Sequence, residues 1–128
     1  MQRSETRFVR IEAFDKSAKK LREPGRGRVL NRAHEFQLAW GNSKQDSDIP
    51  GGFGLDQLAH EQGKYRVLEI RVTDWRLAVM ILDDVSGAYW IHTWRKTGRR
   101  NPEDVRLSTA RAEKLYTLMS KEREHGRE

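Results

Sequence analysis

Three consecutive predicted strands, joined by short turns, constrain the fold of this chain most. The runs Tyr65–Val72, Trp75–Leu82 and Ala88–Arg95 are rich in β-branched, aromatic and aliphatic residues, which favours strands. Because the connections at 73–74 and 83–87 are short, the three strands should pair in sequence order and antiparallel. The middle strand is apolar on both faces, which indicates a central, covered position.

The remaining elements are predicted from apolar periodicity and turn-forming residues. They are a first strand, two helices, a short helical turn and a last helix, over residues 7–14, 15–21, 28–40, 55–62 and from Pro102 onward. Pro24 and two glycines separate the two early helices, so these helices should form a hairpin that packs on the sheet. The fold class predicted is α+β: a small antiparallel, mixed-edge sheet of about four strands with an N-terminal helical hairpin and a C-terminal helix.

The length of 128 residues suits a single domain, 1–128. Residues 41–54 are polar and glycine-rich, which predicts a flexible loop, and the charged tail 121–128 should fray. The chain has no cysteine, which excludes disulfides and thiolate metal sites. No apolar run approaches the roughly 20 residues of a membrane span, and no secretory signal begins the chain, so we expect a cytoplasmic protein.

The charge balance favours an anionic partner. The net charge is +6, which fits nucleic acid, the ribosome or an acidic protein, although solubility alone would also explain it. The cations are densest just after the third strand, where Arg95, Lys96, Arg99 and Arg100 follow His92. A sheet that ends in such a cluster is suited to binding phosphates.

Strand alternation gives the candidate residues around this cluster. Trp90, His92 and Trp94 should share one face, where the tryptophans are either core residues or a stacking platform for bases. His92 is either a structural histidine or a group that titrates in catalysis. Arg71 and Arg76 flank the first turn, and Glu69 could form an ion pair with one of these arginines. Arg95 and Lys96 end the third strand, and the strand register decides whether these side chains converge with the arginines.

The segments YRVLEIRV, DWRLAVMIL and HTWRKTGRRNP, followed by STARAEKLY, resemble the RelE/ParE toxin superfamily, and more closely its phage-derived, HigB-like branch. The order of the predicted elements is similar as well. The spacing from His92 to Pro102 fits the family pattern without a gap.

This resemblance implies the toxin of a type II toxin–antitoxin system, a ribosome-dependent endoribonuclease that cuts messenger RNA. In such enzymes the ribose 2′-hydroxyl attacks the adjacent phosphate, which requires a proton acceptor and fixed cations. The candidate catalytic residues are His92, Arg76, Lys96 and Arg95, and the candidate RNA-binding residues are Arg71, Arg99, Arg100 and Lys64. The expected partners are messenger RNA on the ribosome and a cognate antitoxin, a helix-turn-helix protein. We expect no metal, no cofactor and no membrane.

Two features depart from the family. The paired lysines of RelE-type enzymes fall near Val67 and Glu69, and their C-terminal tyrosine has no counterpart near Pro102. The alternative is therefore a non-catalytic binding protein of the same fold. It would be a gyrase poison, or a phage accessory protein that binds nucleic acid or an antitoxin.

Overall fold

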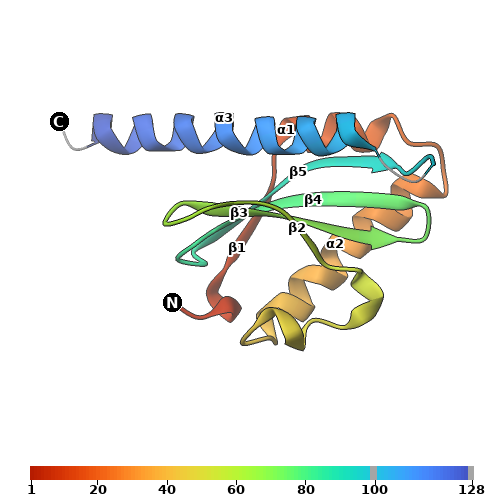
Figure 1. The fold of residues 1–128 in the computed structure, drawn as a ribbon, viewed down its shortest axis with the longest axis horizontal. Coiled ribbons are helices and arrows are strands. Elements are labelled where there is room, and N and C mark those ends of the chain that lie inside the picture. Colours follow the sequence, from red (N-terminus) through yellow and green to blue (C-terminus); the bar gives the residue numbers. More distant parts are fainter. Residues whose placement is uncertain (99–100, 127–128) are drawn as a thin grey trace.

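A five-stranded mixed sheet forms the centre of the structure (Figure 1). This computed structural model describes residues 1–98 and 101–126. The strands are β1 (Arg7–Arg10), β2 (Asp56–Glu61), β3 (Tyr65–Val72), β4 (Trp75–Leu82) and β5 (Gly87–Arg95). Their order in the sheet is β1-β5-β4-β3-β2, with β1 parallel to β5 and all other neighbours antiparallel. The predicted α+β class and the sequential pairing of the three long strands are confirmed.

Helices cover both faces of this sheet. They are α1 (Glu12–Lys19), α2 (Gly25–Gly41) and α3 (Pro102–Gly126), and short 3-10 turns lie at η1 (Arg3–Glu5), η2 (Asp46–Asp48) and η3 (Gly51–Phe53). On one face, Phe36 and Trp40 of α2 are fully buried against the strands. On the other face, α3 packs through Ala112 and Leu115. Figure 1 shows α3 along one side of the sheet and α2 along the other.

The first strand is shorter than predicted. β1 ends at Arg10, and Ile11 is the N-terminal cap of α1, with extended backbone angles of φ −78° and ψ 159°. The prediction of a strand over 7–14 is therefore wrong for residues 11–14. Alternating apolar residues fit a strand here, but in the helix Phe14 and Ala18 lie one turn apart and both are buried.

The helical turn predicted at residues 55–62 is also wrong. These residues form the edge strand β2, which pairs antiparallel with β3 and brings the sheet to five strands rather than about four. Within β2 only Leu58 and Ala59 are partly buried, so the apolar pattern is too weak to indicate a strand. The strand is instead determined by the hydrogen-bonding edge that β3 offers, which is a tertiary effect.

The segment predicted as a flexible loop, residues 41–54, packs against the rest of the protein. Two 3-10 turns follow the end of α2, and the Ile49 and Phe53 side chains are buried in the core. Asp46 accepts hydrogen bonds from Arg3 at 2.7 Å and from Arg66 at 2.6 Å, which ties the segment to the N-terminus and to β3. Its flexibility stays a prediction.

The last helix begins at Pro102, as predicted, with Glu103 and Asp104 in its first turn. It continues to Gly126, through most of the tail that was expected to fray. Over the described residues, none of the helices is both long enough and apolar enough to pass through a lipid bilayer.

A β-bulge in β5 changes which side chains share a face. Ala78 of β4 pairs with His92, but the following residue of β4 pairs with Trp90, so Ile91 has no partner of its own. The prediction that Trp90 lies on the same face as His92 and Trp94 is therefore wrong. Trp90 is buried in the core beneath α2, whereas Trp94 belongs to the core beneath α3.

Candidate active site

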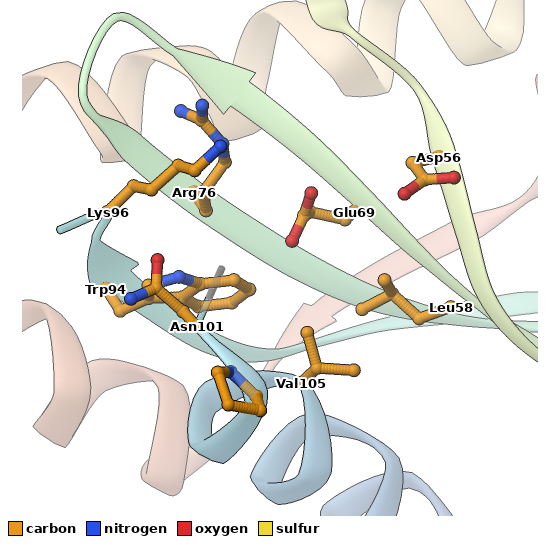
Figure 2. Close-up of a pocket in the computed structure, with 9 residues that line it drawn as sticks. Asp56, Leu58, Glu69, Arg76, Trp94, Lys96, Asn101 and Val105 are labelled. Carbon is orange, nitrogen blue, oxygen red and sulfur yellow. The ribbon is translucent and has the colours of Figure 1, made fainter. Parts of the chain in front are cut away.

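A cavity of about 340 Å³ with charged and apolar walls opens where the sheet extends past the beginning of α3 (Figure 2). Side chains from β2, β3, β4, the end of β5 and the first turn of α3 form its walls. The lining residues are Asp56, Leu58, Glu69, Arg76, Trp94, Lys96, Asn101, Pro102 and Val105. Two of the candidate catalytic residues, Arg76 and Lys96, therefore lie in one pocket.

Strand alternation brings the charged residues of this pocket to one face of the sheet. On β3, Val67 lies in the core beneath α3, and Glu69 is the next residue on that face. On β4, Ala78 pairs with Glu69, and Arg76 precedes Ala78 on the same face. Because α3 begins only at Pro102, beside the pocket, the helix covers Val67 and Ala78 but leaves the charged residues at the cavity wall.

Arg76 and Lys96 supply two cations to one end of the pocket. Nη1 of Arg76 donates hydrogen bonds to the carbonyl oxygens of Thr73 at 2.8 Å and Trp75 at 2.9 Å, which holds the guanidinium at the β3–β4 turn. The backbone N–H of Lys96 donates to the carbonyl of Asp74 at 2.7 Å, which fixes the end of β5 beside the same turn. In Figure 2 the two side chains point to the same side of the cavity. Two neighbouring cations favour an anion between them, so this end of the pocket suits a phosphate.

Glu69 is the acidic group at the centre of the pocket (Figure 2). Burial raises the pKa of its carboxyl above the ordinary value of 4.5, and the nearby carboxylate of Asp56 acts in the same direction. The positive charges of Arg76 and Lys96 oppose this pKa shift. A half-buried carboxylate with a raised pKa, next to cations, has the properties of a general base.

The pocket wall also carries a donor and an acceptor that have no partner among the described residues. They are the indole Nε1 of Trp94, a residue 5% exposed, and the Oδ1 of Asn101. The amide nitrogen of Asn101 donates to the carbonyl of Thr97 at 3.1 Å, which fixes the orientation of the amide. Buried polar atoms are normally hydrogen-bonded, so these two covered atoms are exceptions to the rule beside the pocket.

The architecture around this pocket is known from another protein. The structure matches a chain of the archaeal RelE–RelB complex from Pyrococcus horikoshii OT3, with a TM-score of 0.53 and 13% sequence identity. The match covers 75% of this chain and 99% of that chain. The fold is RelE-like. No protein-family model and no curated protein sequence matches the chain. The likeness establishes the fold that the sequence predicts, and the HigB-like branch stays a prediction.

His92 lies outside the pocket of this RelE-like fold, in a buried cluster that joins β5 to two helices. Its Nδ1 accepts a hydrogen bond from Arg111 at 3.0 Å, and the hydroxyl of Ser17 lies 3.0 Å from the same nitrogen. Because Arg111 can only donate, the ring proton belongs to Nε2, which donates to the carboxylate of Asp104 at 2.8 Å. Burial lowers the pKa of His92, and the positive charge of Arg111 adds to this effect, against the opposing hydrogen bond to Asp104. The ring also stacks on Trp94, which places His92 behind the pocket wall rather than in the pocket.

The two candidate arginines nearest to the pocket point elsewhere. Arg71 pairs directly with Arg76, but its side chain lies against Gly54, where an added Cβ would come within 2.5 Å of the Arg71 Nε. Arg95 is exposed and pairs with Trp75, one residue before Lys96 and hence directed to the opposite face of the sheet. Neither arginine lines the pocket as the structure describes it.

The other RNA-binding candidates are not brought to the pocket. Lys64 lies in the β2–β3 turn, at the opposite end of β3 from the β3–β4 turn, and borders a small cavity with Tyr65 and Tyr116. Arg99 and Arg100 lie outside the described residues.

Sequence reasoning missed the acidic half of the site. Glu69 was considered only as an ion-pair partner of a nearby arginine, and neither Asp56 nor Asn101 was singled out. The sequence did contain one signal for Glu69. It follows Tyr65 and Val67 on one face of β3, and an acidic residue after two core residues on the same face is unusual. In the described part of the chain, no group of three or more His, Cys, Asp or Glu side chains is placed to hold a metal ion.

Proposed function

We propose that this protein is an RNA-cleaving toxin whose active site is the pocket around Glu69, Arg76 and Lys96. The observation that carries the proposal is the combination of a carboxyl of raised pKa with two cations, in one cavity of a RelE-like sheet. A carboxylate and two cations meet the two chemical demands of phosphodiester transfer, proton removal and charge stabilisation.

In the proposed reaction, the Glu69 carboxylate takes the proton of a ribose 2′-hydroxyl. The 2′-oxygen then forms a bond to the adjacent phosphorus, and the bond from phosphorus to the 5′-oxygen of the next nucleotide breaks. Arg76 and Lys96 stabilise the negative charge that builds on the phosphate oxygens. The Lys96 ammonium donates a proton to the leaving oxygen, so the products are a 2′,3′-cyclic phosphate and a 5′-hydroxyl end.

The proposed reaction gives Glu69 the role of the proton acceptor. The raised pKa of Glu69 means that the carboxyl holds a transferred proton more readily than an ordinary glutamate does. When Glu69 and Asp56 are both charged, Arg76 and Lys96 balance the two carboxylates of the pocket, and the two cations lie together at one end of it, where a phosphate would bind.

The proposed partners follow from the RelE-like fold and the proposed reaction. RelE of Pyrococcus horikoshii OT3 was solved as a complex with RelB. We infer that the present chain likewise has an antitoxin, a helix-turn-helix protein, and that it acts on messenger RNA on the ribosome in the cytoplasm.

A second candidate function is a non-catalytic poison of gyrase, or a nucleic-acid-binding protein, on the same scaffold. The observation that favours it is the placement of His92, since both ring nitrogens are engaged and the ring does not line the pocket. In that case the pocket would bind an anion without cutting it.

Cell-free translation in the presence of the purified protein separates the two candidates. The proposed enzyme cuts ribosome-bound message and leaves 2′,3′-cyclic phosphate ends, which are mapped by primer extension and end-specific ligation. Intact message together with inhibited DNA supercoiling would overturn the proposal and support the poison.

A further inference from the structure

Nearly all of the net positive charge of the chain is concentrated outside the pocket. Residues 16–28 contain six cationic side chains and one acidic side chain, which leaves five of the six net charges of the chain in this segment. The segment comprises the second half of α1, the turn after it and the start of α2. We call it the basic elbow.

The basic elbow is held in a defined position on the sheet. Gly25 lies so close to the indole of Trp75 that an added Cβ would come within 2.5 Å of Nε1. Arg26 donates to the carbonyl oxygens of Ala18 at 3.3 Å and Lys19 at 2.8 Å, which satisfies the C-terminal end of α1. The charges on this segment therefore sit on a fixed scaffold at the beginning of β4.

Most of its cations face solvent without an acidic partner. Lys19, Lys20, Arg22 and Arg28 are exposed, and none of them forms an ion pair with any residue the structure describes. Arg28 lies over the ring of Trp75, 5.7 Å from its centroid. Such a concentration of uncompensated charge attracts a polyanion.

The elbow and the pocket lie at the same end of the sheet. Trp75 packs against the elbow, and the next residue, Arg76, lines the pocket. On β5, Arg95 pairs with Trp75, and the following Lys96 lines the pocket. In Figure 1 the connection between α1 and α2 lies at the end of the molecule where the β3–β4 turn and the start of α3 are found. Cations therefore continue from the pocket, over the end of the sheet, to the elbow.

We propose that the basic elbow binds the phosphate backbone of RNA that extends beyond the pocket. This inference rests on the proposed function, which places an RNA phosphate between Arg76 and Lys96. The exposed groups of the elbow are ammonium and guanidinium groups, which contact phosphates rather than read bases, so binding here is independent of sequence. An RNA strand fits better than an acidic protein because its charges repeat along the path from the pocket.

The test compares two triple variants that lose the same charge. K19Q/K20Q/R22Q removes three exposed cations from the elbow, and K114Q/K121Q/R123Q removes three exposed cations from the far half of α3. Binding of a long, unstructured RNA carrying 2′-O-methyl groups, which cannot be cut, is measured by fluorescence anisotropy between low and moderate salt. A dinucleotide that fills only the pocket is measured in parallel, and thermal unfolding checks that each variant is folded.

The elbow variant should bind the long RNA more weakly, and the slope of log K against log salt should fall by about 2, because each lost contact to a single strand contributes about 0.7. Its affinity for the dinucleotide should be unchanged, and the α3 variant should behave as wild type. Equal losses in the two variants, or an unchanged slope in the elbow variant, would overturn the inference. Polyglutamate serves as a probe for acidic proteins. If the elbow variant keeps RNA binding but loses polyglutamate binding, the elbow is a docking surface for an acidic protein instead.

These outcomes are independent of catalysis. A changed slope in the elbow variant supports RNA binding there even if the wild-type protein cuts no message. Conversely, an unchanged slope together with cleaved message rejects RNA binding at the elbow and leaves the proposed function in place.

Discussion

Trp75 and Arg76 are adjacent in the chain, yet they belong to opposite faces of the sheet. Trp75 packs with the core beneath α2 and touches Gly25, whereas Arg76 lines the pocket on the face of α3. The start of β4 therefore couples the position of the basic elbow to the position of a cation in the pocket.

The contact between Gly25 and Trp75 gives a prediction about stability. The substitution Gly25→Ala places a Cβ within 2.5 Å of the indole, so the ring or the helix must shift. This shift should destabilise the fold by about 1–3 kcal/mol. Gly51→Ala is the matched control, because nothing lies within 4 Å of a Cβ there and the change should stay within about 0.5 kcal/mol. Urea unfolding of both variants measures the difference. Equal free energies of unfolding would show that the elbow does not press on Trp75.

The His92 cluster predicts how stability depends on pH. Because the folded-state pKa of His92 is lowered, the unfolded chain binds a proton at a higher pH than the native protein does. The stabilising contribution of the neutral ring is therefore complete above the ordinary pKa of 6.5 and is lost as the pH falls from 6.5 towards the lowered value.

A variant isolates this effect. His92→Gln keeps a donor for Asp104 but does not titrate, so its melting temperature should fall less than that of the wild type as the pH drops below 6.5. His34→Gln, at an exposed position on α2, should keep the wild-type dependence. A steep fall that persists in His92→Gln would place the titrating group elsewhere.

Lys96 and Lys64, which are both candidates from the sequence, should differ in their effect on cleavage. Lys96→Ala removes a cation from the pocket wall and should slow cleavage about 100-fold or more, as the loss of a transition-state donor does. Lys64→Ala, at the opposite end of β3, should leave the rate near that of the wild type. Rates of message cleavage during cell-free translation provide the comparison. Similar losses in both variants would indicate a diffuse electrostatic effect rather than a site.

The sequence was sufficient for the central part of the fold. The strands β3, β4 and β5 are predicted almost to the residue because their apolar and β-branched content is local information. β2 could not be predicted, since only the unpaired edge of β3 makes residues 56–61 a strand. The first helix was placed too late because the residues from Ile11 to Phe14 alternate like a strand.

The site was predicted in part for similar reasons. Arg76 and Lys96 were candidates because they match basic positions of the family that the sequence resembles, and the pairing of β3, β4 and β5 then brings their strand ends together. The position of His92 could not be derived, because Arg111 and Asp104 of α3 engage its ring and nothing in the local sequence reveals them. The bulge at Ile91, which separates Trp90 from the face of His92, is likewise a property of the pairing with β4.

The most direct measurement is the rate of message cleavage by Glu69→Gln, with Glu61→Gln on the exposed edge strand β2 as its control. The amide fits the pocket but cannot accept the 2′-proton, so cleavage should fall by about 100-fold to 10,000-fold. The free energy of unfolding at neutral pH should not decrease, because burial disfavours the charged carboxylate that the substitution removes. The control should cut as the wild type does. Wild-type cleavage by Glu69→Gln, with the same cyclic phosphate ends, would contradict the account.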